Sequence, residues 1–127
     1  MTLSLYVCLG LQLTSAPLTV RPRNTVVVQG ERAVLHCQTN TTTSSTAAAA
    51  LSWKFTSTDG VDKGFIYNDD GQNGRYSERG VSVHINYTSG DHPLVFNSTV
   101  LADAGTYTCQ DGGGIGEAHA AWIAVLG

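Results

Sequence analysis

Charged residues are scarce in this chain, and basic ones especially so. Its 127 residues contain 7 Lys and Arg against 10 Asp and Glu, which gives a formal net charge of −3 and a charged fraction of 13%. A protein that binds nucleic acid electrostatically needs a basic surface, so we do not expect this class of partner. Hydrophobic residues reach 42%, which excludes a disordered tail. The length suits one domain with a buried core.

Long apolar runs are also missing, except near the N-terminus. Residues 3–13 are mostly apolar, and the small residues Thr14 and Ala16 precede Pro17 as in a cleavage site. A membrane helix needs ~20 apolar residues, so this stretch is too short to be one. We expect residues 1–16 to be a signal peptide and residues 17–127 to be the mature domain. The alternative is that the first segment forms a strand of the domain.

Cysteines are few, and their number fits secretion. The chain has Cys8, Cys37 and Cys109, and loss of the leader would leave an even pair, as in a secreted domain with one disulfide. Three N-glycosylation sequons begin at Asn40, Asn86 and Asn97. Together these features predict an extracellular location, with N-linked glycans at the three asparagines.

No stretch has a convincing helical period, and the chain reads as all-β. Short apolar, aromatic and β-branched runs recur as NTVVVQG, RAVLHC, LSWKF, GFIY, GVSVHI, LVFNSTV, GTYTCQ and AAWIAVL. Turn signals such as Asp-Gly, Asn-Gly and Ser-Gly-Asp separate them. Eight or nine strands at this spacing predict an antiparallel two-sheet sandwich.

Sets of residues for catalysis or metal binding are also lacking. The histidines at 36, 84, 92 and 119 are scattered, so we interpret them as surface or hydrogen-bonded side chains. The glycines of residues 112–116 stand between two strands, which indicates a hairpin loop instead of a phosphate loop. Residues 68–73 lack the spacing and closing Glu of a calcium loop. We expect no metal, no cofactor and no enzymatic activity.

The segment LADAGTYTCQ, residues 101–110, holds an acid, a glycine, a phenol and a thiol. These groups allow a catalytic interpretation, but Thr-Tyr-Thr-Cys is also a strand by propensity and alternation. Alternation places Tyr107 on the same face as Cys109. Trp53 lies in LSWKF, between Cys37 and Cys109. This Cys…Trp…Cys order, ending in Asp-Ala-Gly-Thr-Tyr-Thr-Cys, resembles the immunoglobulin superfamily over residues 18–126.

The resemblance implies structural roles for the reactive-looking residues. It implies a disulfide between Cys37 and Cys109 that packs against Trp53, and a tyrosine corner at Tyr107. The stretch from Trp53 to Cys109 is long enough for the two extra strands of a variable-type (V-set) domain, a Greek-key sandwich. In that family an Arg opening strand D pairs with an Asp at the E–F turn. The matching pair here is Arg79 and Asp103, with Arg75 as the alternative Arg.

Departures from the family pattern reduce the number of functions that we expect. The Phe/Trp-Gly-x-Gly bulge of antigen receptors is missing from the last strand, and Lys-Phe-Thr follows Trp53 where antibody domains place Tyr-x-Gln. An antibody-like paired chain is therefore not expected. The strand that holds Tyr107 has no Arg, which sialic-acid-binding relatives use there.

Alternation predicts a binding face on one sheet. An inward Ile123 leaves Trp122 outward, and an inward Ile66 leaves Phe65 and Tyr67 outward. Aromatic side chains on a face with few charges resemble the core of a protein interface. The expected partner-binding residues are Trp122, Tyr67, Phe65, Gln110 and Thr108, with Lys54 beside them. The alternative for Trp122 is that it packs beneath the N-terminal segment of its own chain.

We therefore expect an extracellular recognition module of a cell-surface adhesion or immune-type receptor. It would bind a protein partner through this face, either a second copy or a different protein. One alternative is a soluble, secreted immune-recognition protein that uses its loops, including residues 38–50. A structural spacer without a ligand is a third class. The chain would be either secreted or the ectodomain of a single-pass membrane protein.

Overall fold

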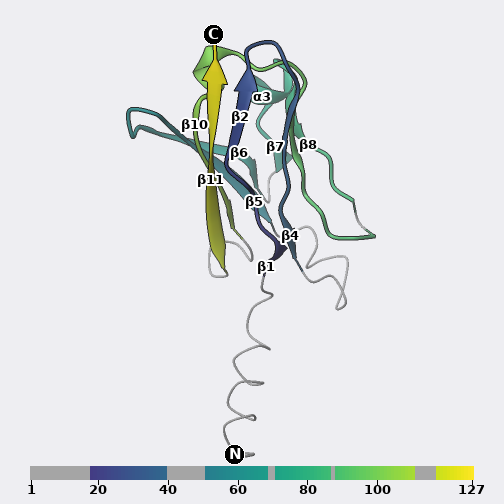
Figure 1. Ribbon diagram of the computed structural model, residues 1–127. Helices are drawn as coiled ribbons and strands as arrows, with labels where there is room; N and C mark the ends of the chain where they lie inside the picture. The colour runs from purple at the N-terminus through teal and green to yellow at the C-terminus, as the bar shows by residue number, and fades with distance from the viewer. Residues whose placement is uncertain (1–17, 40–50, 69–70, 87, 111–116) are drawn as a thin grey trace, which may run out of the picture.

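The computed structural model describes residues 18–39, 51–68, 71–86, 88–110 and 117–127. The expected leader, the sequon at Asn40 and the glycine-rich residues 112–116 lie outside them. Two layers of strands form the domain (Figure 1). The larger sheet has the strand order β2 (Thr25–Val28), β11 (Ala118–Leu126), β10 (Gly105–Gln110), β5 (Ser52–Ser57), β6 (Asp62–Asn68) and β7 (Gly71–Gln72).

The second layer is a three-stranded sheet with the order β3 (Ala33–Leu35), β9 (Leu94–Phe96) and β8 (Val81–Val83). A separate pair joins β1 (Leu18–Val20) to β4 (Gln38–Thr39). All pairings are antiparallel except that of β2 with β11. The predicted all-β sandwich is confirmed. The two extra strands that the family resemblance implies correspond to β6 and β7.

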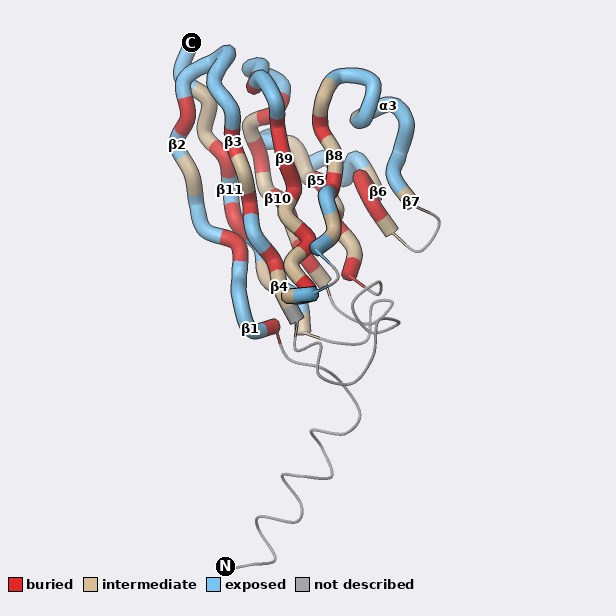
Figure 2. The backbone as a smooth tube through the Cα atoms, turned by 90° about the vertical axis from the view of Figure 1, so that its right-hand side faces the viewer, coloured by how far each residue is buried: buried red, intermediate tan, exposed pale blue. Residues whose placement is uncertain are grey.

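Alternation along the central strands builds the core. In β10 the side chains of Tyr107 and Cys109 are buried, and they lie opposite Phe55 and Trp53 of β5. The rings of Phe55 and Tyr107 stack with their centroids 4.6 Å apart. Because successive residues of a strand face opposite sides, Thr108 and Lys54 point away from this core. Figure 2 shows the buried stretches along the strands, while the turns near the C-terminus are exposed.

Strand β6 departs from simple alternation, and one expectation was wrong for this reason. Trp53 pairs with Tyr67 and the next residue, Lys54, pairs with Phe65, so the register shifts around Ile66. An extra residue in one strand is a β-bulge, which turns two neighbouring side chains toward the same face. Ile66 is 1% exposed and Tyr67 is 9% exposed. Tyr67 therefore belongs to the core and not to the predicted binding face.

Two short helical turns complete the described fold. The helix α3 (Gly74–Ser77) is capped by Asn73, whose side chain accepts the backbone N–H of Arg75 at 3.1 Å. The 3₁₀ turn η1 (Leu101–Asp103) precedes β10 and lies near the C-terminus (Figure 1). Neither turn was predicted, because segments of three or four residues are too short to show a helical period. Strand β1 lies at the opposite end of the sandwich from the C-terminus (Figure 1).

Candidate functional site

The two cysteines of the domain join the layers. Cys37 and Cys109 form a disulfide with their Cα atoms 6.5 Å apart, and both side chains are fully buried. Trp53, also fully buried, donates its indole N–H to the carbonyl of His92 at 2.8 Å. A bridge between residues 72 positions apart removes chain entropy from the unfolded state. Both sulfur atoms are used in this bond, so neither is a nucleophile.

Asp103 is the centre of a buried cluster at the start of β10. Its side chain is 1% exposed, and its carboxylate is ion-paired with Arg79 and accepts the Val100 N–H at 2.8 Å. The Tyr107 hydroxyl donates to the Asp103 carbonyl at 2.5 Å. Burial, followed by the negative charge of Asp103, raises the pKa of the Tyr107 hydroxyl, so the phenol stays protonated. Arg75, the alternative partner, lies in α3 instead.

Gly105 is required where β10 begins. A Cβ atom at this position would lie 2.5 Å from the carbonyl oxygen of Thr56 and 2.6 Å from the ring of Phe55. Its φ of 150° also disfavours a side chain. The acid, glycine, phenol and thiol of residues 103–109 thus have structural roles: ion pairing, close strand packing, corner formation and disulfide bonding. These structural roles replace the catalytic interpretation of the segment.

The outer surface of the six-stranded sheet brings most of the predicted contact residues together. Across the strands, Trp122 lies opposite Thr106, Thr108 lies opposite both Ala120 and Lys54, and Lys54 lies opposite Phe65. Trp122 is 44% exposed and Phe65 is 46% exposed. We call this surface the aromatic face; it consists of Trp122, Phe65, Thr106, Thr108, Gln110 and Lys54.

Lys54 is the basic side chain of the aromatic face. Its ammonium nitrogen lies 2.9 Å from the carboxylate of Asp62 and 5.9 Å from the centre of the Phe65 ring. The hydrogen bond from Lys54 holds the pKa of the Asp62 carboxyl below its ordinary value. Since its charge is matched by Asp62, Lys54 adds little net charge to the surface around Phe65.

An open hollow of about 570 Å³ lies beside Trp122. Its walls come from Trp122 and Ala124 of β11, from the start of β10, and from the end of β5 with the turn after it. The Trp122 backbone N–H donates to the Asn24 side chain at 3.0 Å, while the indole remains nearly half exposed. Within the described residues, Trp122 therefore projects outward beside a hollow.

An apolar extension of this face was not predicted. Strand β2 runs parallel to β11, with Val26 beside Ala124 and Val28 beside Leu126. Val26, Val28 and Leu126 are all exposed, whereas Val27 is buried. Three consecutive valines conceal the alternation, because polarity does not distinguish their inward and outward positions. The apolar surface thus continues from Trp122 to the edge strand β2.

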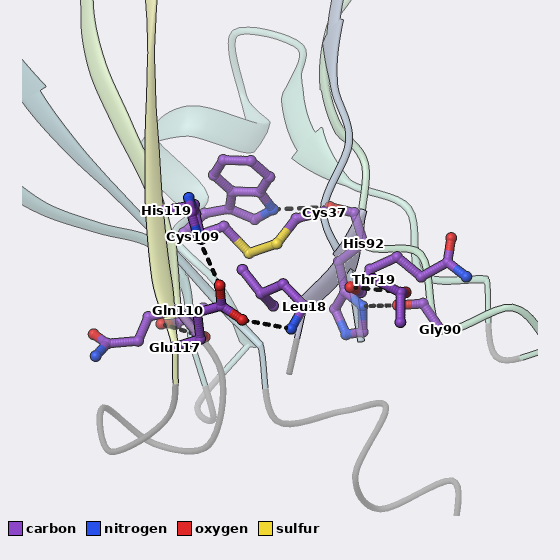
Figure 3. Close-up of a disulfide and its surroundings, with 12 residues drawn as sticks. Leu18, Thr19, Cys37, Gly90, His92, Cys109, Gln110, Glu117 and His119 are labelled. Atoms are coloured by element: carbon purple, nitrogen blue, oxygen red, sulfur yellow. Dashed lines mark hydrogen bonds and ion pairs between the residues drawn. A yellow bond between two sulfur atoms is a disulfide. The ribbon is translucent and has the colours of Figure 1, made fainter. Parts of the chain in front are cut away.

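Glu117 holds the first strand against the last one. Its carboxylate accepts the Leu18 N–H at 3.0 Å, pairs with Arg21 at 2.8 Å and lies 2.7 Å from His119. Figure 3 shows Glu117 between Leu18 and His119, close to the disulfide. The hydrogen bond from Leu18, followed by those from Arg21 and His119, lowers the pKa of Glu117 to about 2. The carboxylate therefore stays charged in neutral solution.

His92 fits the hydrogen-bonded alternative at only one of its two ring nitrogens. It is fully buried, with Nδ1 2.9 Å from the Gly90 carbonyl, so that this nitrogen carries the proton. Its Nε2 has no hydrogen-bond partner in the described structure. Burial lowers the pKa of His92. His36 and His84 are exposed, as expected. The described residues contain no group of three His, Cys, Asp or Glu side chains suited to a metal ion.

The asparagines of two of the three sequons are described residues. Asn86 is exposed, and its side chain accepts the N–H groups of Thr88 and Ser89 at 3.0 and 3.2 Å. Asn97 is exposed directly after β9, on the three-stranded layer. Both asparagines lie away from the aromatic face.

Comparison with known proteins identifies the relatives of this sandwich. The family model described as the immunoglobulin V-set domain matches residues 20–122. The first Ig domain of mouse polymeric immunoglobulin receptor superposes with a TM-score of 0.67 at 16% identity, covering 87% of this chain and 95% of that one. The Titin M10–Obscurin like 1 Ig mutant complex gives 0.61 at 24% identity, covering 88% and 93%. No curated protein matches the sequence. None of the described helices is long and apolar enough to cross a membrane.

Proposed function

Since the chain belongs to the immunoglobulin V-set family, whose domains are typically extracellular recognition modules without enzymatic activity, we propose that it is the recognition module of a cell-surface adhesion or immune-type receptor. It binds a protein partner through the aromatic face. The observation that carries this proposal is the exposed Trp122, which stands between a hollow and the apolar edge formed by Val26 and Val28.

The size of the exposed indole supports this role. A tryptophan side chain buries up to ~250 Å², so the 44% left exposed amounts to roughly 110 Å². At about 25 cal/mol/Å², covering it with a partner contributes ~2–3 kcal/mol. That is the contribution of an interface hot spot, and Trp is the residue most enriched at such positions.

The neighbours of Trp122 favour close approach by a partner. Ala120, Ala124 and Thr106 surround it with short side chains, and the charge of Lys54 on the same face is matched by Asp62. A second protein can therefore reach the indole without displacing long side chains or burying an unpaired charge. Exposed Asn86 and Asn97 place their expected glycans elsewhere, which leaves this face accessible.

The experiment compares three single variants of the secreted domain. Trp122→Ala and Phe65→Ala each remove an exposed aromatic side chain of the aromatic face, and Val61→Ala truncates another exposed apolar side chain outside the face. Sedimentation equilibrium measures self-association, and binding of a tetramerised domain to a panel of cells measures association with other proteins. We expect Trp122→Ala to weaken association by about 30-fold, which is ~2 kcal/mol. Equal binding by Trp122→Ala, Phe65→Ala and the wild type would exclude the aromatic face and favour the loops.

A further inference from the structure

Two adjoining hollows lie over the outer side of the three-stranded sheet, and the first extends to β1 and to the start of β2. The first has a volume of about 510 Å³ and is lined by Val20, Arg21, Arg23, Asn24, Thr25, Val34 and His36. The second, of about 490 Å³, is lined by Arg32, Val34, His36, His84, Pro93, Val95 and Asn97. Because they share Val34 and His36, the hollows form one continuous depression over the outer side of β3. We call it the basic groove.

The lining of the basic groove is positive in a protein that is negative overall. Arg21, Arg23 and Arg32 are three of the chain's 7 Lys and Arg residues, and His36 and His84 add two imidazoles. None of the described lining residues is acidic. This concentration of basic groups contrasts with the net charge of −3 and marks the groove as a surface for an anionic partner.

Nearby acids neutralise part of this charge, but not all of it. Glu117 pairs with Arg21 at 2.8 Å, and Asp91 lies 2.9 Å from His36. No ion pair involves Arg23 or Arg32 in the described part of the chain, and both residues are exposed. These two guanidinium groups are therefore available to an anion, one in each hollow.

The spacing of the basic groups fits a chain of anions better than a single one. Arg32 and His36 flank β3 and share the outward side of Val34, so their Cα atoms are roughly 14 Å apart at the strand rise of ~3.4 Å per residue. Arg23 lies across the groove in the first hollow. A lone phosphate or sulfate needs donors that converge on one point, whereas these donors are spread out.

The uncharged residues that line the basic groove favour one class of polyanion over others. Val20, Val34, Pro93 and Val95 supply apolar surface between the charges, and Asn24 and Thr25 supply hydrogen-bonding groups. Pyranose rings present apolar faces together with hydroxyl groups, and sulfate groups pair with guanidinium ions. The concave shape suits a narrow chain better than a flat bilayer. We propose that the basic groove binds a sulfated polysaccharide, independently of the protein partner of the opposite sheet.

The test measures retention of the purified domain on immobilised heparin, with Arg23→Gln, Arg32→Gln and the double variant. Arg75→Gln is the matched control, because it removes the same charge from an exposed residue outside both hollows. We expect the double variant to bind at least tenfold more weakly, and Arg75→Gln to change affinity less than twofold. Wild-type binding should weaken as salt rises, since exposed ion pairs are screened. Thermal melts verify that each variant is folded.

Competitors identify the anion. Heparin fragments should displace the domain, whereas desulfated heparin, polyglutamate and vesicles containing phosphatidylserine should not. Equal competition by polyglutamate would assign the groove to acidic peptides, and equal competition by vesicles would assign it to membranes; either result would overturn the proposal. No retention of the wild type, or an equal loss in Arg75→Gln, would also overturn it. The series is repeated with Asn97→Gln, which keeps a glycan out of the second hollow, and the same ranking is expected.

Discussion

Replacing Asp103 by Asn removes one charge from a buried cluster while nearly preserving its shape. The carboxylate accepts from two donors, the Arg79 guanidinium and the Val100 N–H. An amide has a single acceptor oxygen, so it can satisfy one of these donors and must present its NH₂ group to the other. The change therefore leaves one donor without its partner in a buried position, which carries a desolvation cost.

The magnitude follows from the unequal burial of the two partners. Breaking a fully buried ion pair costs ~3–5 kcal/mol, and an exposed pair is worth at most about 1 kcal/mol. The Asp103 side chain is 1% exposed and the Arg79 side chain is 35% exposed, so water can solvate the Arg after the change. We expect Asp103→Asn to lower the free energy of unfolding by about 2–3 kcal/mol.

Urea denaturation, followed by tryptophan fluorescence, measures this loss. With a slope of about 1–2 kcal/mol/M, the midpoint should fall by roughly 1–3 M. The control Arg75→Gln should leave the midpoint in place, because Arg75 is exposed in α3. A double-mutant cycle of Asp103→Asn with Arg79→Gln isolates the pair energy. A loss below about 0.5 kcal/mol, or weaker partner binding at unchanged stability, would refute the structural role of the cluster.

Three further changes test other parts of the fold. Cys37→Ser opens a loop spanning 72 positions, so it should lower the free energy of unfolding by ~2–5 kcal/mol and reduce secretion. Urea denaturation and the yield in the medium measure these effects, and wild-type stability would contradict the role of the bridge. Gly105→Ala should destabilise by more than ~2 kcal/mol, because its Cβ would meet the Thr56 carbonyl at 2.5 Å; an unchanged melting temperature would show that the strands can separate. Burial lowers the pKa of His92, so below about pH 6.5 the unfolded chain binds a proton that the folded chain does not bind. The free energy of unfolding should therefore decrease as the pH is lowered below this value, by up to ~1.4 kcal/mol per pH unit. His92→Asn should flatten this slope and His84→Asn should not, and identical slopes in both variants would place the proton uptake elsewhere.

The central strands could be predicted because their alternation is unambiguous. In β10 polar and buried side chains alternate from Gly105 to Gln110, so the inward face follows from the sequence, while the register with β5 comes from the structure. The pairing of Cys37 with Cys109 and of Arg79 with Asp103 came from the family resemblance, and both are present in the structure.

Other features depend on tertiary geometry that no local pattern carries. The bulge at Ile66 turns Tyr67 inward, although strict alternation predicts the outside. Val26, Val27 and Val28 look alike in sequence, and only the pairing of β2 with β11 separates the exposed ones from the buried one. The basic groove unites residues from four separate segments, so their scattered positions gave no sign of a cluster.

A glycan placed on the aromatic face tests the proposed function most directly. Lys54→Asn creates an Asn-Phe-Thr sequon at the centre of that face. The control Arg75→Asn removes the same charge and creates an Asn-Tyr-Ser sequon in α3, outside both the aromatic face and the basic groove. Gel mobility verifies that each glycan is attached, and enzymatic deglycosylation controls for the lost basic residue. The measurement is binding of the tetramerised domain to cells and to itself. The account predicts that Lys54→Asn abolishes binding until the glycan is removed, while Arg75→Asn binds as the wild type does. Full binding by the glycosylated Lys54→Asn protein would contradict it.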